Sequence, residues 1–282
     1  MTRNESQAPR RAAVLGSPIA HSLSPVLHRA AYARLGLTGW SYGRHEVDEA
    51  ALPGFLAGIE RVRAEEGWAG LSLTMPLKRA VIPLLDETDP TALAVNAVNT
   101  LIFRPDGGRY GANTDVTGLT AALRERGVTS VHSAAVLGAG ATAGSALAAL
   151  SDLVKGPITV YLRNKAKLAE FDTLVRHFGL DLDPRPWHEA ADAADHELVI
   201  NTTPAGAADQ LAETLPGRVG TLFDVLYHPW PTPLAAAWST RGGAVLGGQD
   251  LLVHQAVRQV ELMTGIEGHA PEILAAMREA LG

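Results

Sequence analysis

Residues 134–144 (AAVLGAGATAG) constrain the fold more than any other stretch, because a short apolar run there enters a glycine turn and leaves in an alanine-rich segment. The turn has the pattern Gly138-x-Gly140-x-x-Ala143. The first glycine permits a tight bend, the second lets the backbone approach a pyrophosphate, and the small third residue lets a helix pack on the strand. The N–H groups at the helix start favour an anion. The turn predicts a dinucleotide site, with a purely structural strand-to-helix turn as the alternative.

The flanking sequence predicts a parallel sheet covered by helices. Residues 134–137 and 158–161 are expected to be strands on either side of a helix at 145–153, which makes a βαβ unit. Further strands are expected at 198–201, 221–224 and 244–246. Ligands of such sheets bind at the carboxyl ends of the strands. We therefore expect residues 201–206 to line the adenosine.

The residues after the second strand of this unit favour NADP over NAD. An NAD site usually carries an acidic residue there, whereas an NADP site carries arginine. The strand ends in Leu162-Arg163-Asn164 and is followed by Lys165 and Lys167, with no acidic residue before Glu170. The guanidinium can form a planar fork on a 2′-phosphate, and the lysines add charge. The alternative is a solvated basic helix start.

The N-terminal half combines predicted strands at 12–15, 40–47 and 70–75 with helices at 26–35 and 49–65. Ser22 and Ser24 flank one residue of a turn-rich loop, so in an extended segment they would point the same way. Alternatively, Ser24 caps the helix with Pro25 at its first position. Thr74 and Lys78 should emerge together at the carboxyl end of a strand, although a lysine there is often only a solvated helix residue.

Two Asn-Thr pairs and one glutamine complete the candidate polar residues. A hairpin turn at 104–108 (RPDGG) should return the second pair beside the first and bring Asp115 within reach of Asn99. Alternatively, Asn113 and Asp115 are turn and cap residues of a helix at 116–126. In a helix expected at 251–264, Gln255 lies on an apolar side, so it is either a buried glutamine with a partner or a ligand contact. A final helix is expected at 271–281.

Composition excludes several functional classes. The 282 residues are 46% hydrophobic, which is ample for two domains, and the formal charge of −6 gives no electrostatic reason to bind nucleic acid or anionic membranes. The absence of cysteine excludes disulfides, thiolate metal sites and a cysteine nucleophile. The histidines lack metal-binding spacing, so no metal is expected. Residues 1–10 look like a disordered tail, and no run approaches the roughly 18 apolar residues of a membrane span. A cytoplasmic monomer or homodimer is expected.

Taken in chain order, these segments resemble the shikimate dehydrogenase family. The resemblance covers nearly the whole chain after the tail and includes motifs outside the nucleotide fold. The motifs are GSPIAHSLSP at 16–25, LTMPLK at 73–78, NAVNT at 96–100, NTD at 113–115, GAGA at 138–141, NTT at 201–203, YHP at 227–229 with TP at 232–233, and LLVHQ at 251–255.

The resemblance implies a two-domain α/β fold and the reversible reduction of 3-dehydroshikimate to shikimate with NADP(H), in aromatic amino-acid biosynthesis. A substrate-binding catalytic domain would comprise residues 1–115 and 249–282, completed by the C-terminal helices, and a Rossmann-type NADP domain residues 116–248. Lys78 and Asp115 look like the catalytic pair. The substrate contacts would be Ser22, Ser24, Thr74, Asn99, Tyr227 and Gln255. The cofactor contacts would be Gly138, Ala139, Gly140, Ala141, Thr142, Arg163, Asn164, Lys167, Asn201, Thr202, Thr203 and, through its backbone toward the nicotinamide, Gly248.

Departures from the family pattern leave alternatives open. Family members commonly carry Asn-Val-Thr where Ser72-Leu73-Thr74 stands and Asn-Arg-Thr where Leu162-Arg163-Asn164 stands. The nearest rival is a quinate/shikimate dehydrogenase that uses NAD. A two-domain folate dehydrogenase would not explain the loop of Ser22 and Ser24. A nucleotide-binding sensor without catalysis would not need both Lys78 and Asp115.

Overall fold

The computed structural model describes residues 9–282, which divide into two compact units. The first unit comprises residues 9–93, 97–114 and 255–282, and the second comprises residues 94–96 and 115–254. Asp115 and the start of the long C-terminal helix thus belong to the second unit. Residues 1–8 of the predicted tail lie outside the described residues, whereas Arg10 already begins the first strand.

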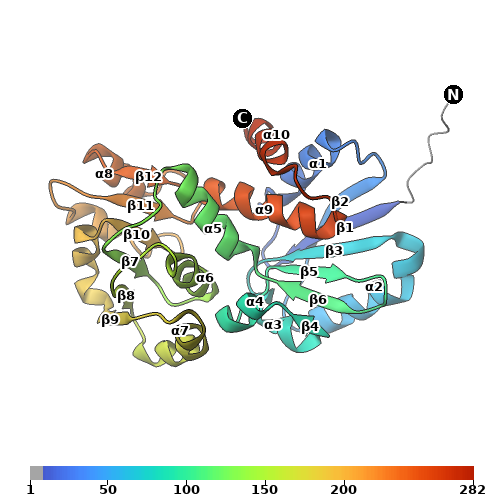
Figure 1. Ribbon diagram of the computed structural model, residues 1–282, viewed down its shortest axis with the longest axis horizontal. Helices are drawn as coiled ribbons and strands as arrows, with labels where there is room; N and C mark the ends of the chain where they lie inside the picture. Colours follow the sequence, from blue (N-terminus) through green and yellow to red (C-terminus); the bar gives the residue numbers. More distant parts are fainter. Residues whose placement is uncertain (1–8) are drawn as a thin grey trace. The chain divides into compact units, whose positions relative to one another are not determined.

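The first unit is built on a six-stranded mixed sheet with the order β2-β1-β3-β5-β6-β4 (Figure 1). The central strand β1 pairs in parallel with β2 and β3, and β5 returns antiparallel to β3. Residues 12–16 of β1 and all of β3 are buried rather than alternately buried and exposed, as in strands that are covered on both faces. Leu15, Leu71 and Leu101 lie fully buried in this core. The strands are β1 Arg10–Gly16, β2 Trp40–Glu46, β3 Trp68–Leu73, β4 Glu87–Thr88, β5 Thr100–Phe103 and β6 Arg109–Ala112.

The helices of this unit include the C-terminal segment of the chain. Helix α10 packs along α1, so the last helix of the chain lies beside its first helix within one unit (Figure 1). Helix α2 ends at Gly67, whose φ of 66° is the left-handed conformation that glycine adopts without strain. The helices are α1 Ser24–Arg34, α2 Leu52–Glu66, α3 Leu77–Ala80, η1 Ile82–Leu84, α4 Pro90–Val95 as far as Leu93, the second half of α9 Gly248–Thr264, and α10 Ala270–Leu281.

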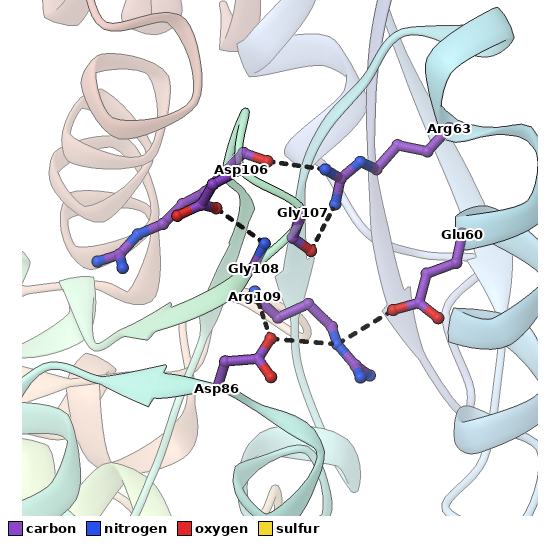
Figure 2. A network of polar contacts seen from close by, with 8 residues as sticks. Glu60, Arg63, Asp86, Asp106, Gly107, Gly108 and Arg109 are labelled. Carbon is purple, nitrogen blue, oxygen red and sulfur yellow. Dashed lines mark hydrogen bonds and ion pairs between the residues drawn. The ribbon is translucent and has the colours of Figure 1, made fainter.

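The predicted hairpin at 104–108 is confirmed, and α2 fixes its turn (Figure 2). Strands β5 and β6 pair with Thr100 opposite Ala112. The Arg63 guanidinium donates to the carbonyl oxygens of Gly107 at 3.1 Å and Arg104 at 2.7 Å. Since this register is what returns the second Asn-Thr pair to the first, the turn positions candidate site residues at the other end of the hairpin.

The second unit contains a six-stranded parallel sheet with the order β12-β11-β10-β7-β8-β9. The chain enters at the centre and winds outward in both directions, which is the Rossmann arrangement and confirms the predicted fold class. Strand β9 was not predicted, because its two prolines are typical of loops; as an edge strand it tolerates them. The strands are β7 Ala134–Leu137, β8 Ile158–Leu162, β9 Leu182–Pro186, β10 Leu198–Asn201, β11 Thr221–Asp224 and β12 Ala244–Leu246.

Helix α6 begins at Ala141, directly after Gly140 and four residues before the predicted start. The glycine turn therefore leads straight into the helix, and its first backbone N–H groups lie at the turn. The helices of this unit are α5 Thr114–Glu125, α6 Ala141–Leu150, η2 Lys165–Phe171, α7 Asp172–Phe178, η3 Trp187–Asp195, η4 Asp209–Glu213 and α8 Pro233–Thr240, with the first half of α9. No helix within residues 9–282 is long and apolar enough to cross a membrane.

Candidate active site

Backbone hydrogen bonds gather the candidate residues of the first unit where β3 ends and β5 begins. Leu73 N donates to Asn99 O at 2.8 Å, because the antiparallel strands place the end of one beside the start of the other. Val98 N donates to Lys78 O, also at 2.8 Å. Lys78 lies half-buried in the single turn of α3, and its backbone is thus bonded to the residue that precedes Asn99. The structure thus brings Lys78 and Asn99 to the same sheet end.

Thr74 lies at the same place, against the start of the serine-containing loop. Thr74 N donates to Leu15 O and Ser17 N donates to Met75 O, each at 3.0 Å. A Cβ at Gly16 would lie 2.5 Å from the Thr74 side chain and 2.9 Å from Met75 O, so only glycine permits this approach. The loop that carries Ser22 and Ser24 is therefore anchored beside Thr74.

Both sequence arguments about Ser22 and Ser24 are wrong in detail. Leu23 between them has helical dihedrals, so the segment is not extended, and Leu23 rather than Ser24 stands at the cap position of α1. No side-chain hydrogen bond caps this helix; instead Ser22 Oγ accepts the backbone N–H of Ser24 at 3.4 Å. Ser24 is buried and Ser22 is half-buried. The local turn, rather than strand alternation, sets the direction of the two hydroxyls.

Asn99 is bonded to Thr114, which the sequence reasoning did not single out. Asn99 Oδ1 accepts Thr114 N–H at 2.8 Å, and Asn99 Nδ2 donates to Thr114 Oγ1 at 3.0 Å. Thr114 Oγ1 lies 3.4 Å from Gln255 Oε1, to which it donates. Gln255 is thus a buried glutamine with a protein partner. The repeated Asn-Thr pair was the available signal for Thr114, since the hairpin places its second copy beside Asn99.

Asp115 follows Thr114 directly and stands in the first turn of α5. It is only 5% exposed. A carboxylate in a first helical turn is stabilised by the positive end of the helix dipole and by the free N–H groups there. Thr114, the residue before Asp115, is held by the hydrogen bond from its backbone N–H to Asn99 Oδ1.

In the second unit, the glycine turn has the shape that the motif predicts. Gly138 has φ of 111°, and a Cβ there would lie 2.7 Å from Thr202 Oγ1. A Cβ at Gly140 would meet nothing within 4 Å, so the backbone at this position faces open space. Ala139 and the first-turn residues Ala141 and Thr142 are half-buried, whereas Ala143 is fully buried. The turn exposes backbone N–H groups to a ligand while the helix packs closely behind them.

The Asn201-Thr202-Thr203 turn lies at the point where the sheet order reverses. Thr202 Oγ1 donates across to Leu137 O at 2.8 Å, joining the ends of β10 and β7. Asn201 Oδ1 accepts Thr203 N–H at 3.1 Å and Thr203 Oγ1–H at 2.7 Å. The Asn201 side chain is buried, and its hydrogen bonds to Thr203 stabilise this turn. Ligands of Rossmann sheets bind at such a switch point.

The basic segment after β8 divides into a structural part and an exposed part. Asn164 Oδ1 accepts Ala166 N–H at 3.0 Å and caps η2, and Lys167 pairs with Glu170 at 3.7 Å. Both residues fit the alternative of a solvated helix start. Arg163 is exposed, and no hydrogen bond or ion pair within residues 9–282 holds its guanidinium. This fork can bind a phosphate without breaking a contact.

The loop that carries Tyr227 is fixed by a buried carboxyl group. Asp224 is fully buried and accepts Thr232 Oγ1–H at 2.7 Å and Leu226 N–H at 3.3 Å, while burial raises its pKa. Burial also raises the pKa of the Tyr227 phenol, which stays protonated at neutral pH. A Cβ at Gly248 would lie 2.3 Å from Val225 O, and Gly248 N already donates to Leu226 O at 3.0 Å. The absent side chain at Gly248 lets α9 begin directly against this loop.

No cluster of three or more side chains suited to a metal ion occurs in the described part of the chain. The donors gathered in the first unit are hydroxyls, amides and one lysine, which suit a small polyhydroxylated acid. The turn of the second unit suits a dinucleotide.

Comparison with known proteins identifies the family. The family model described as the shikimate dehydrogenase substrate binding domain matches residues 14–101. A curated relative from Acidiphilium cryptum, named shikimate dehydrogenase (NADP(+)), is 38% identical over 88% of each chain. The crystal structure of Mycobacterium tuberculosis shikimate dehydrogenase is 40% identical, covers 96% of this chain and all of its own, and has a TM-score of 0.85.

A third match is the shikimate 5-dehydrogenase of Thermus thermophilus, whose structure is a complex with NADP(H) and shikimate. It is 32% identical, covers 96% of this chain and 99% of its own, and has a TM-score of 0.79. Identity above 30% along nearly the whole length of these proteins, together with the family model, leads to one conclusion: the chain belongs to the shikimate dehydrogenase family.

Proposed function

We propose that the protein catalyses the reversible, NADP-dependent reduction of 3-dehydroshikimate to shikimate, a step of aromatic amino-acid biosynthesis. The observation that carries this proposal is the buried set Asn99, Thr114 and Gln255 at the sheet end that also holds Lys78. Buried amides and hydroxyls reject ligands that leave them unpaired, so they select for a substrate with matching hydroxyl groups. The names of the curated relatives and the shikimate-bound Thermus structure support the same substrate.

In this scheme the first unit binds the substrate and the second unit binds the cofactor. Ser22, Ser24, Thr74, Asn99 and Gln255 offer donors and acceptors to the substrate carboxylate and hydroxyls, and the protonated Tyr227 phenol adds a donor. The scheme uses groups of a single chain, so it holds for a monomer or a homodimer.

The residues of the second unit fit NADP(H). The open backbone at Gly140 and the N–H groups of Ala141 and Thr142 would receive the pyrophosphate. The Arg163 fork would receive the 2′-phosphate. Ala139, Asn164, Lys167, Asn201, Thr202 and Thr203 would line the dinucleotide, and Gly248 the nicotinamide end. When bound, the cofactor supplies or accepts a hydride.

Lys78 and Asp115 would handle the proton. Reduction of the ketone creates an alkoxide, which needs a proton donor or a positive charge within about 3 Å. We assign Lys78 Nζ as the group that gives this proton in reduction and takes it back in oxidation. We assign Asp115, whose carboxylate is buried in the first turn of α5, as the second residue of the catalytic pair.

An absorbance assay at the NADPH band tests the function, with shikimate or quinate offered with NADP or NAD in turn. Rapid reduction of NADP by shikimate is expected. Turnover of quinate with NAD, or no turnover in any combination, would overturn the proposal.

Replacing the lysine tests the mechanism. Lys78→Ala should lower kcat at least a hundredfold while the shikimate KM changes much less, because the lost interaction forms mainly in the transition state. Lys155→Ala, the same change at an exposed position, should retain wild-type turnover. Unchanged kcat in Lys78→Ala would refute the assignment.

A further inference from the structure

A chain of buried hydrogen bonds leads from Tyr42 in β2 to Asn99, through residues that the mechanism above does not use. Tyr42 Oη lies 2.6 Å from Ser72 Oγ, which lies 2.7 Å from Gln259 Oε1. Gln259 Nε2 lies 3.1 Å from Thr100 Oγ1 and 3.2 Å from Asn99 O. Thr100 Oγ1 then lies 2.8 Å from Asn99 Oδ1. Every member is at most 4% exposed, and all belong to the first unit.

Backbone groups at one end of this chain fix the direction of every bond in it. Asn99 O can only accept, so the Gln259 atom that faces it must be the donor Nε2. The Oε1 atom must then face Ser72. Ser72 therefore donates its single proton to Gln259 and accepts the proton of Tyr42. Since Oε1 can only accept, no other arrangement satisfies these three side chains.

A second backbone group fixes the Asn99 side chain independently. Thr114 N–H can only donate, so the atom of Asn99 that faces it is Oδ1. Gln259 Nε2 donates into Thr100 Oγ1, which directs the single Thr100 proton to Asn99 Oδ1. Gln259 thus holds Asn99 in two ways: directly at the backbone carbonyl, and through Thr100 at the side-chain oxygen.

We propose that Gln259, oriented by Ser72 and Tyr42, is a positioning residue that fixes the Asn99 carboxamide for substrate binding. This inference rests on the proposed function, in which Asn99 contacts shikimate. With Asn99 Oδ1 engaged by Thr100 and Thr114, the carboxamide acts on the substrate through its Nδ2 donor. Without Gln259, the Thr100 hydroxyl can turn toward Thr114 Oγ1, which lies 3.4 Å away, and Asn99 loses two of its restraints.

The physical argument for a positioning role is the free-energy cost of burying these polar side chains. Buried polar groups are expensive unless all are satisfied, and an apolar core of the same shape is often equally stable. A linear chain of satisfied groups that ends on a substrate contact instead restricts the movement of that contact. Misplacement of a binding group by about 1 Å can cost two orders of magnitude in rate.

Steady-state kinetics of Gln259→Leu and Ser72→Ala test the inference. The shikimate KM should rise about tenfold in Gln259→Leu and about threefold in Ser72→Ala, where one hydrogen bond further from Asn99 is lost. The NADP KM should stay within twofold, which shows that each variant is folded. Ser72→Thr keeps the hydroxyl and should keep the wild-type KM. Gln210→Leu, at an exposed position in η4, is the matched control for the glutamine change.

A double-mutant cycle separates positioning from a general structural role. Shikimate affinity is measured by titration calorimetry, which needs no turnover, for Gln259→Leu, Asn99→Ala and the double variant. If Gln259 acts through Asn99, adding Gln259→Leu to Asn99→Ala should change the affinity less than twofold.

Three outcomes have distinct meanings. Additive losses in the cycle, or an unchanged shikimate KM in both Gln259→Leu and Ser72→Ala, would overturn the positioning role while the proposed function stands. A wild-type protein that neither binds nor oxidises shikimate would instead overturn the proposed function, and this inference with it.

Discussion

His28 should make the protein lose stability as the pH falls below neutrality. Its imidazole is fully buried in α1 and stacks on Tyr42, with ring centroids 3.9 Å apart and an interplanar angle of 19°. Nδ1 lies 3.0 Å from Ser24 O, and Nε2 has no hydrogen-bond partner among residues 9–282. Burial lowers the pKa of His28 from 6.5 to about 4, since the site disfavours the charged ring.

The sign and size of the effect follow from linkage. The unfolded chain binds a proton near pH 6.5, whereas the folded chain resists it until about pH 4. Acid therefore favours the unfolded state: the contribution of His28 to stability is complete above pH 6.5 and declines as the pH falls toward 4. The free energy of unfolding should fall by about 2 kcal/mol between pH 7.5 and pH 5, and by about 3 kcal/mol by pH 4, from this group alone.

Urea unfolding at pH 7.5 and pH 5 checks this value in the wild type and in His28→Phe, which keeps a ring against Tyr42 but cannot titrate. The difference between the two pH values should be about 2 kcal/mol smaller in the variant. His188→Phe, at an exposed position, should keep the wild-type dependence. Equal pH dependence of the wild type and His28→Phe would refute the reasoning.

Two further predictions concern the dinucleotide site. Gly138→Ala should destabilise the protein by about 2 kcal/mol, because φ of 111° and the contact with Thr202 strain any side chain there. Gly140→Ala should leave stability unchanged and weaken NADP binding. Chemical unfolding and NADP titration separate the two, and equal stability losses would contradict the assigned roles of the two glycines. Arg163→Ala should raise the NADP KM tenfold or more and leave the NAD KM nearly unchanged, because the proposed function assigns the exposed guanidinium to the 2′-phosphate, which NAD lacks. Equal effects on both cofactors in steady-state assays would show that Arg163 does not read this phosphate.

Local sequence was sufficient for the elements whose pattern is short-range. The apolar run and glycine turn at 134–143 predicted a strand, a turn and a helix that the structure contains, and RPDGG predicted the hairpin. Strand β9 was not predicted from the sequence, because its prolines otherwise indicate a loop and only an edge strand tolerates them. The serine loop misled in another way: Ser-x-Ser-Pro favours both an extended segment and a cap, and the chain adopts neither.

The candidate site shows the same division between local and tertiary information. Motif order alone named Lys78, Asn99 and Gln255, while the roles of all the site residues remain predictions. The sequence by itself determined the Rossmann unit and the hairpin, because these follow from short-range patterns along the chain, and the resemblance of its motifs indicated the family. Only the tertiary structure decided that Gln259, 160 residues beyond Asn99, donates to it, and that Ser72 and Tyr42 orient that glutamine. Such partners are joined by sheet and helix packing, and hydrogen bonds between distant residues leave no periodicity in the sequence.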